Sequence, residues 1–116
     1  MANPLVYFTN HNCCKSVLLA ANEKLNLGLD EKAMNLALGF GTGMKVGSVC
    51  GAITGGIMAI SSYYENDPRM VTVKTKEFIK NIKDKFGTLE CRELKAKKIS
   101  CEEMVETAYN TLLAIL

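Results

Sequence analysis

Residues 46–64 read VGSVCGAITGGIMAISSYY, and this stretch contains no charged side chain. Its glycines and hydroxyl-bearing residues dilute its hydrophobicity, so it favours a buried helix of a small soluble protein over a transmembrane span. Small residues recur at every fourth position, namely Gly47, Gly51, Gly55 and Ala59. That spacing places them on one face of a helix, where a neighbouring helix can approach closely. We therefore expect a central helix over roughly residues 45–65, with this small-residue face packed against another helix.

Similar periodicity predicts helices on both sides of this stretch. Apolar residues spaced by three and four indicate helices over residues 10–26, 30–40 and 69–86. A capping box formed by Ser100 and Glu103 begins a last helix that runs to Leu116. A short turn covers residues 91–97, and no segment shows the alternation of a strand. The expected fold is all-α: a small antiparallel bundle of four principal helices plus a short extra turn, with the glycine-striped third helix buried.

Length and composition favour one domain over residues 1–116, in which residues 1–8 form an extended N-terminal arm because Pro4 interrupts an early helix. The net charge is only +2. Residues 69–98 hold ten Lys and Arg against four Asp and Glu, which is typical of a solvated helix face, so no nucleic-acid partner is expected. The sequence shows no basic and apolar secretion signal at its start, and this predicts a cytoplasmic protein with no membrane partner.

Five cysteines carry the main chemical signal, and none of them forms a C-x-x-C pair. Three of them fall at predicted helix starts: Cys13, Cys91 and Cys101. Unpaired N–H groups and the helix dipole stabilise a thiolate there, and a thiolate is the form that attacks disulfides or binds soft metals. A small buried hydrophobe is the other interpretation of a free cysteine, and both interpretations stay open.

His11 and Cys14 stand three residues apart and could share a helix face. A cysteine–histidine pair can activate a thiol nucleophile. No third orienting group is evident in the sequence, so a solvated histidine is the favoured interpretation, and the roles of both residues stay open.

The order of the cysteine-containing motifs resembles a known family. Residues 50–55 read CGAITG and match C-G-A-x-x-G, with NCCKSV upstream at residues 12–17 and GFGTGM between them at residues 39–44. Downstream, residues 86–94 read FGTLECREL, and Cys101 follows. From about Asn12 to Leu113 this arrangement is similar to that of the C_GCAxxG_C_C family of redox-active proteins.

The resemblance implies that the family's four cysteines are Cys13, Cys50, Cys91 and Cys101, and that Cys14 is an extra one. The four would serve as redox thiols that cycle between dithiol and disulfide, or as ligands of an iron–sulfur cluster or a zinc ion. Gly51 and Gly55 would then leave room for a bound group beside Cys50. The resemblance names no reaction, so the chain would be an oxidoreductase or an electron-transfer accessory with a redox partner protein.

The alternative function is a non-enzymatic interaction module with structural cysteines. Residues 112–116 read LLAIL, and a helix end with so many apolar side chains must be buried against another protein surface. In this interpretation the glycine face and this helix end would serve helix packing or the formation of a homodimer.

Overall fold

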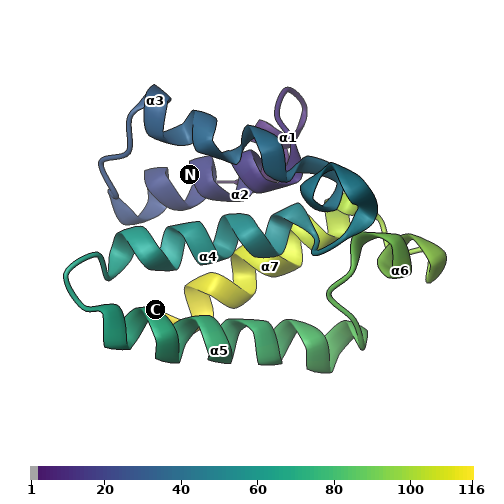
Figure 1. The fold of residues 1–116 in the computed structure, drawn as a ribbon. Helices are drawn as coiled ribbons and strands as arrows, with labels where there is room; N and C mark the ends of the chain where they lie inside the picture. Colours follow the sequence, from purple (N-terminus) through teal and green to yellow (C-terminus); the bar gives the residue numbers. More distant parts are fainter. Residues whose placement is uncertain (1–2) are drawn as a thin grey trace.

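Helix α4 (Gly51–Tyr63) runs through the middle of the fold, and the other helices surround it (Figure 1). The structure is a computed structural model, and it describes residues 3–116. Those residues contain seven α-helices and no strand, which confirms the all-α fold. The remaining elements are α1 (Pro4–Phe8), α2 (Cys13–Leu25), α3 (Glu31–Met34), the 3-10 helix η1 (Asn35–Phe40), the turn η2 (Gly43–Gly47), α5 (Pro68–Phe86), α6 (Cys91–Ala96) and α7 (Cys101–Ile115).

Three long helices, α2, α4 and α7, begin at the same end of the molecule, and α5 runs in the opposite direction (Figure 1). The segment between α2 and α4 carries the chain back along the length of α2. Helix α4 therefore starts beside the start of α2 rather than beside its end. For this reason the antiparallel bundle of four principal helices, expected from short loops, is not confirmed.

Residues 4–8 are helical, so the expected extended arm is wrong over these residues. Pro4 occupies the first helical position, where its missing N–H breaks no hydrogen bond. Asn3 caps the helix by accepting a hydrogen bond from the backbone N–H of Leu5 at 2.9 Å. Residues 1 and 2 of the predicted arm lie outside the described residues.

The central helix starts later than its apolar pattern predicts, at Gly51 instead of residue 45. Thr42, Met44 and Lys45 have φ values of 53°, 58° and 67°. These are left-handed conformations, which a right-handed helix cannot contain. The predicted helix of residues 30–40 is likewise split into α3 and a 3-10 turn, and Leu38 is 53% exposed instead of buried. An apolar pattern alone does not distinguish a helix from the tight turns before it.

Helix α2 starts at Cys13 with Asn12 as its cap, later than the predicted start near residue 10, whereas the boundaries of α5 and the start of α7 follow the sequence pattern. Helix α5 begins at Pro68 and ends before Gly87, whose φ of 79° suits glycine. Phe78 on its apolar stripe is fully buried. The hydroxyl of Ser100 accepts the backbone N–H of Glu103 at 3.0 Å, as the capping box predicts. None of the described helices is both long enough and apolar enough to cross a membrane.

The small-residue face of α4 packs directly against α2. A side-chain carbon added to Gly55 would overlap the carbonyl oxygen of Cys14, and one added to Gly51 would lie 2.8 Å from the carbonyl oxygen of Phe40. The expected close approach is confirmed at these two positions. Gly47 precedes the helix and takes no part in the crossing. The crossing fixes the start of α2 against the first turn of α4.

Substitution of Gly55 by alanine tests how much this crossing stabilises the fold. The added methyl group must push α2 away from α4, so we expect Gly55→Ala to lower the free energy of unfolding by about 1–3 kcal/mol. Gly39→Ala is the matched control, because nothing lies within 4 Å of a side-chain carbon placed there. Chemical denaturation measures both variants. A Gly55→Ala protein as stable as the parent would contradict the tight crossing.

Candidate functional site

Four of the five cysteines lie at the beginnings of helices. Cys13, Cys91 and Cys101 are the first residues of α2, α6 and α7, which confirms their predicted places in first helical turns. Cys50 caps α4, although its sequence context predicts a position inside a longer helix. Because α2, α4 and α7 begin at the same end of the molecule (Figure 1), their cysteines gather at that end.

Backbone hydrogen bonds hold Cys50 and Cys91 beside each other. The N–H of Cys50 donates to the carbonyl oxygen of Leu89 at 2.9 Å, and the N–H of Cys91 donates to that of Ser48 at 2.7 Å. The two bonds form an isolated antiparallel bridge between segments far apart in the sequence. Gly43 allows the chain to pass this point, since a side-chain carbon there would lie 2.8 Å from the Cβ of Cys91.

Cys101 is the neighbouring thiol that acts most strongly on Cys13. Negative charge on Cys101 raises the pKa of Cys13 more than negative charge on Cys50 or Cys91 does. Cys13 is only 8% exposed, whereas Cys101 is half-buried and is the most accessible of the five cysteines. All five are free thiols. The pair thus combines one accessible sulfur with one shielded sulfur.

Burial dominates the ionisation of the site. It raises the pKa of Cys13 well above its ordinary value, and negative charge on Cys101, Cys50 and Cys91 raises that pKa further. Burial also raises the pKa of Cys50, although N–H groups in the first turn of α4 act in the opposite direction. Burial and the neighbouring thiols therefore act against the thiolate that a helix start favours at Cys13.

Cys14 lies in the core and does not contact His11. It is fully buried, and its thiol donates a hydrogen bond to the sulfur of Met58 at 3.8 Å. Burial raises the pKa of the Cys14 thiol to about 11. His11 instead lines a surface cleft together with Lys15. The described side chains therefore do not form the thiol–histidine pair considered from the sequence.

Four thiols are a ligand set that zinc and iron–sulfur clusters take in proteins. Within residues 3–116, however, no three His, Cys, Asp or Glu side chains are arranged to hold one metal ion. The donor chemistry suits a soft metal, but the side-chain arrangement does not fit one. Gly51 and Gly55, which were expected to leave room for a cofactor, lie against the backbone around α2. The thiols themselves are the reactive groups that this geometry supports.

Sequence reasoning gave no signal for Glu90, which precedes Cys91. One oxygen of its carboxylate is buried and has no hydrogen-bond partner among the described residues. The backbone N–H of Glu90 donates to the hydroxyl of Thr88 at 3.1 Å, and that hydroxyl donates to Glu93. A turn thus holds a partly buried carboxylate at the residue before Cys91, where it lines a cleft together with Val49 and Lys83. Only the fold reveals it, because a glutamate between a leucine and a cysteine reads as an ordinary surface residue.

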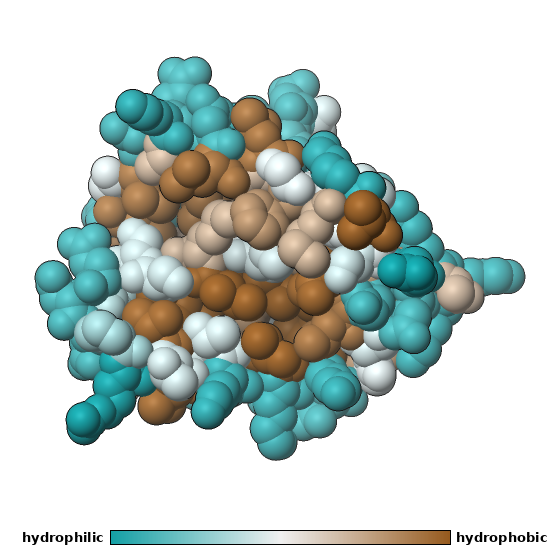
Figure 2. All heavy atoms as spheres, in the orientation of Figure 1, coloured by the Kyte–Doolittle hydropathy of each residue, from teal (hydrophilic) through white to brown (hydrophobic). Residues whose placement is uncertain are grey.

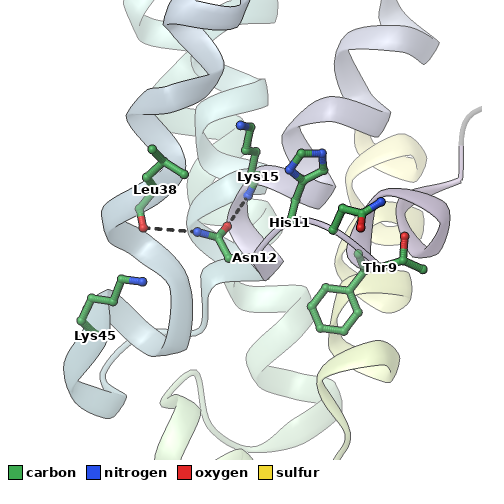
Figure 3. A pocket seen from close by; sticks show the side chains of 8 residues that line it. Thr9, His11, Asn12, Lys15, Leu38 and Lys45 are labelled. Carbon is green, nitrogen blue, oxygen red and sulfur yellow. Dashed lines mark hydrogen bonds between the residues drawn. The ribbon is translucent and has the colours of Figure 1, made fainter.

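A surface cleft of about 660 Å³ opens beside the start of α2 (Figure 3). Asn12 lies at its centre, where its side chain accepts the N–H of Lys15 at 2.8 Å and donates to the carbonyl oxygen of Leu38 at 3.3 Å. Lys45 reaches in from η2 on one side, and His11 stands on the other (Figure 3). The lining residues are Phe8, Thr9, Asn10, His11, Asn12, Lys15, Leu38 and Lys45. One asparagine thus caps α2 and ties η1 to it.

The structure is thus a small all-helical protein in which free thiols lie at the starts of helices. The chain belongs to the C_GCAxxG_C_C family, since the family model described as "Putative redox-active protein (C_GCAxxG_C_C)" matches residues 11–115. A protein of Archaeoglobus fulgidus, named "Uncharacterized protein", is 43% identical over 53 residues, which are 45% of this chain and 35% of that protein. The chain thus matches about a third of this relative's length. No solved structure matches the chain.

Burial predicts an order of thiol reactivity. Only a thiolate reacts with iodoacetamide, so we expect Cys101 to be labelled first and Cys14 last, at rates that differ by about tenfold or more. Timed labelling of the native protein at mildly alkaline pH, followed by mass spectrometry of its peptides, measures this order. Because the pKa of Cys14 is raised, its labelling should increase as the pH approaches about 11. Fast labelling of Cys14 near neutral pH would show that its side chain leaves the core.

Proposed function

We propose that this protein is a redox-active thiol protein that performs dithiol–disulfide exchange through Cys13 and Cys101. The observation that carries the proposal is that Cys13 and Cys101 begin two helices at the same end of the molecule, and that one thiol is shielded while the other is accessible. We include Cys50 and Cys91 in the same four-cysteine site, and the effect of their charges on the pKa of Cys13 supports this. Membership of the family supports redox chemistry without specifying the reaction.

In the proposed reaction the Cys101 thiolate attacks one sulfur of a substrate disulfide. A mixed disulfide forms, the substrate's sulfur–sulfur bond breaks, and one substrate thiol leaves. The Cys13 thiolate then attacks the Cys101 sulfur, which releases the second substrate thiol and leaves a disulfide within the protein. The two protons of the protein thiols end on the substrate thiols, so the substrate gains two electrons and the protein loses two. A dithiol reductant reverses the sequence and restores the protein.

The shielding of Cys13 suits it to the second of these steps. Burial is the main reason why the pKa of Cys13 is raised, and negative charge on Cys101 raises it further. Once Cys101 is part of a mixed disulfide it carries no charge, and this second contribution to the raised pKa disappears. The order of the two attacks therefore follows from burial and charge.

The proposed chemistry also bears on location and partners. Two adjacent thiols stay reduced in a compartment with a thiol-based reducing system, and the cytoplasm is such a compartment. We therefore propose a cytoplasmic protein that meets a redox partner, either the disulfide it reduces or the dithiol that restores it.

A helical module that forms a homodimer is the second candidate, and one observation favours it. Figure 2 shows hydrophobic side chains gathered across the middle of one face, with hydrophilic side chains around its rim. The apolar end of α7 is partly covered within the chain itself, because Leu112 is fully buried and Ile115 is 8% exposed, while Leu113 and Leu116 are half-buried. A homodimer would give a mass that rises with concentration in sedimentation experiments.

Oxidation of the purified protein tests the exchange chemistry. We expect a mild disulfide oxidant to remove two free thiols, and mass spectrometry to find Cys13 linked to Cys101. Cys101→Ser should abolish both the link and the turnover of a substrate disulfide, since no accessible thiol then begins the reaction. Cys14→Ser is the control, and it should retain both because Cys14 lies in the core. Circular dichroism checks that each variant keeps its helices.

Iron and zinc determinations on protein purified without air complete this test. Stoichiometric metal that is lost on replacing all four cysteines by serine would replace the exchange reaction with a metal-centred function. If the protein holds no metal and its thiols resist oxidation, both the exchange reaction and the metal-centred function are overturned. The homodimer would then remain as the candidate function.

A further inference from the structure

The cleft beside α2 is cationic. Its ionisable lining residues are His11, Lys15 and Lys45, and none of its lining residues carries a carboxylate. Lys15 donates a hydrogen bond to the neutral side chain of Asn35 at 3.2 Å, which leaves its charge uncompensated. Among residues 3–116 the ion pairs lie within α5, so neither lysine of the cleft has an acidic partner. The cleft therefore presents positive charge to whatever enters it.

The cleft includes the residue that precedes Cys13, although no cysteine lines it. Asn12 lines it, and Cys13 follows Asn12 at the start of α2. A smaller cleft of about 340 Å³ shares two lining residues with it and extends to Glu102, the residue after Cys101. The two clefts are therefore lined by the residue before Cys13 and the residue after Cys101.

From this placement we infer that the cleft binds the anionic end of the disulfide substrate, and that Lys15 and Lys45 select small disulfides that bear carboxylates. The inference rests on the proposed exchange reaction and adds the substrate class to it. With its carboxylate held by the lysines, the substrate presents its nearer sulfur to Cys101. That sulfur enters the mixed disulfide, and the other leaves as a thiol.

Size and charge both agree with a small anionic substrate. The volume of about 660 Å³ lies within the range of about 300–1,000 Å³ that small-molecule sites occupy. The carboxylate of Glu102 lines the neighbouring cleft and repels an anion there. The anionic end is therefore directed toward the lysine side, and the sulfur–sulfur bond toward the thiols.

Three small disulfides of different charge test this inference. The probes are dithiodipropionate, which is dianionic, hydroxyethyl disulfide, which is neutral, and cystamine, which is dicationic. We expect the parent protein to be oxidised fastest by the dianion. Lys45→Gln and Lys15→Gln should each lower the rate with the dianion by about 1.5- to 5-fold, the effect of one exposed charge, and leave the neutral probe unchanged. Lys76→Gln on α5 is the matched control, which removes the same charge from an exposed site.

The outcomes separate the inference from the function beneath it. Oxidation by all three probes at similar rates, unaffected by either lysine variant, overturns the selection of anions while the exchange reaction stands. No oxidation by any probe overturns the exchange reaction itself. If Lys76→Gln lowers the preference for the dianion as much as Lys45→Gln does, the preference arises from the net charge of the protein. That result would overturn the inference that the cleft binds the anion. Added salt should reduce the preference, because it screens exposed charges.

Discussion

The close crossing of α2 over α4 is the contact on which the rest of the structure depends. Gly55 and Gly51 remove the side chains that would hold the two helices apart, and the carbonyl oxygen of Cys14 occupies the space. Each glycine costs about 0.5–1 kcal/mol relative to alanine in a helix, so tight packing must compensate for that cost. The crossing sets the start of α2 beside the start of α4. The cysteines at these two starts can approach one another only because of it.

Helix starts and burial act in opposite directions on the thiols. A helix start supplies N–H groups that favour a thiolate, and a buried sulfur loses the water that would solvate its charge. At Cys13 and Cys50 burial prevails, and the presence of several thiols near one another strengthens its effect. Burial therefore disfavours the thiolates of Cys13 and Cys50. In the proposed reaction the half-buried Cys101 is the thiol that a substrate reaches first.

Local sequence signals predicted those parts of the fold that depend on short-range chemistry. Proline, glycine and serine marked the ends of α5 and α7, and the first-turn positions of three cysteines followed from them. Local signals did not predict those parts of the fold that depend on backbone conformation and on topology. The left-handed residues Met44 and Lys45 have no apolar signature, so the central helix was expected to start too early. The direction of α4 depends on how the segment before it returns along α2, which no local pattern contains. The cleft lysines and Glu90 acquire their surroundings only from that topology.

Cys13 and Cys101 stand near the two ends of the chain, and this has a consequence for the persistence of the protein. A bond between them would enclose α2, α4 and α5 in one covalent ring. Closing a ring of that length removes entropy from the unfolded chain and is worth about 4–5 kcal/mol of stability. Proteases act on the small fraction of molecules that open, so the oxidised form would outlast the reduced form. The supply of reductant would then govern the lifetime of each molecule as well as its chemical state.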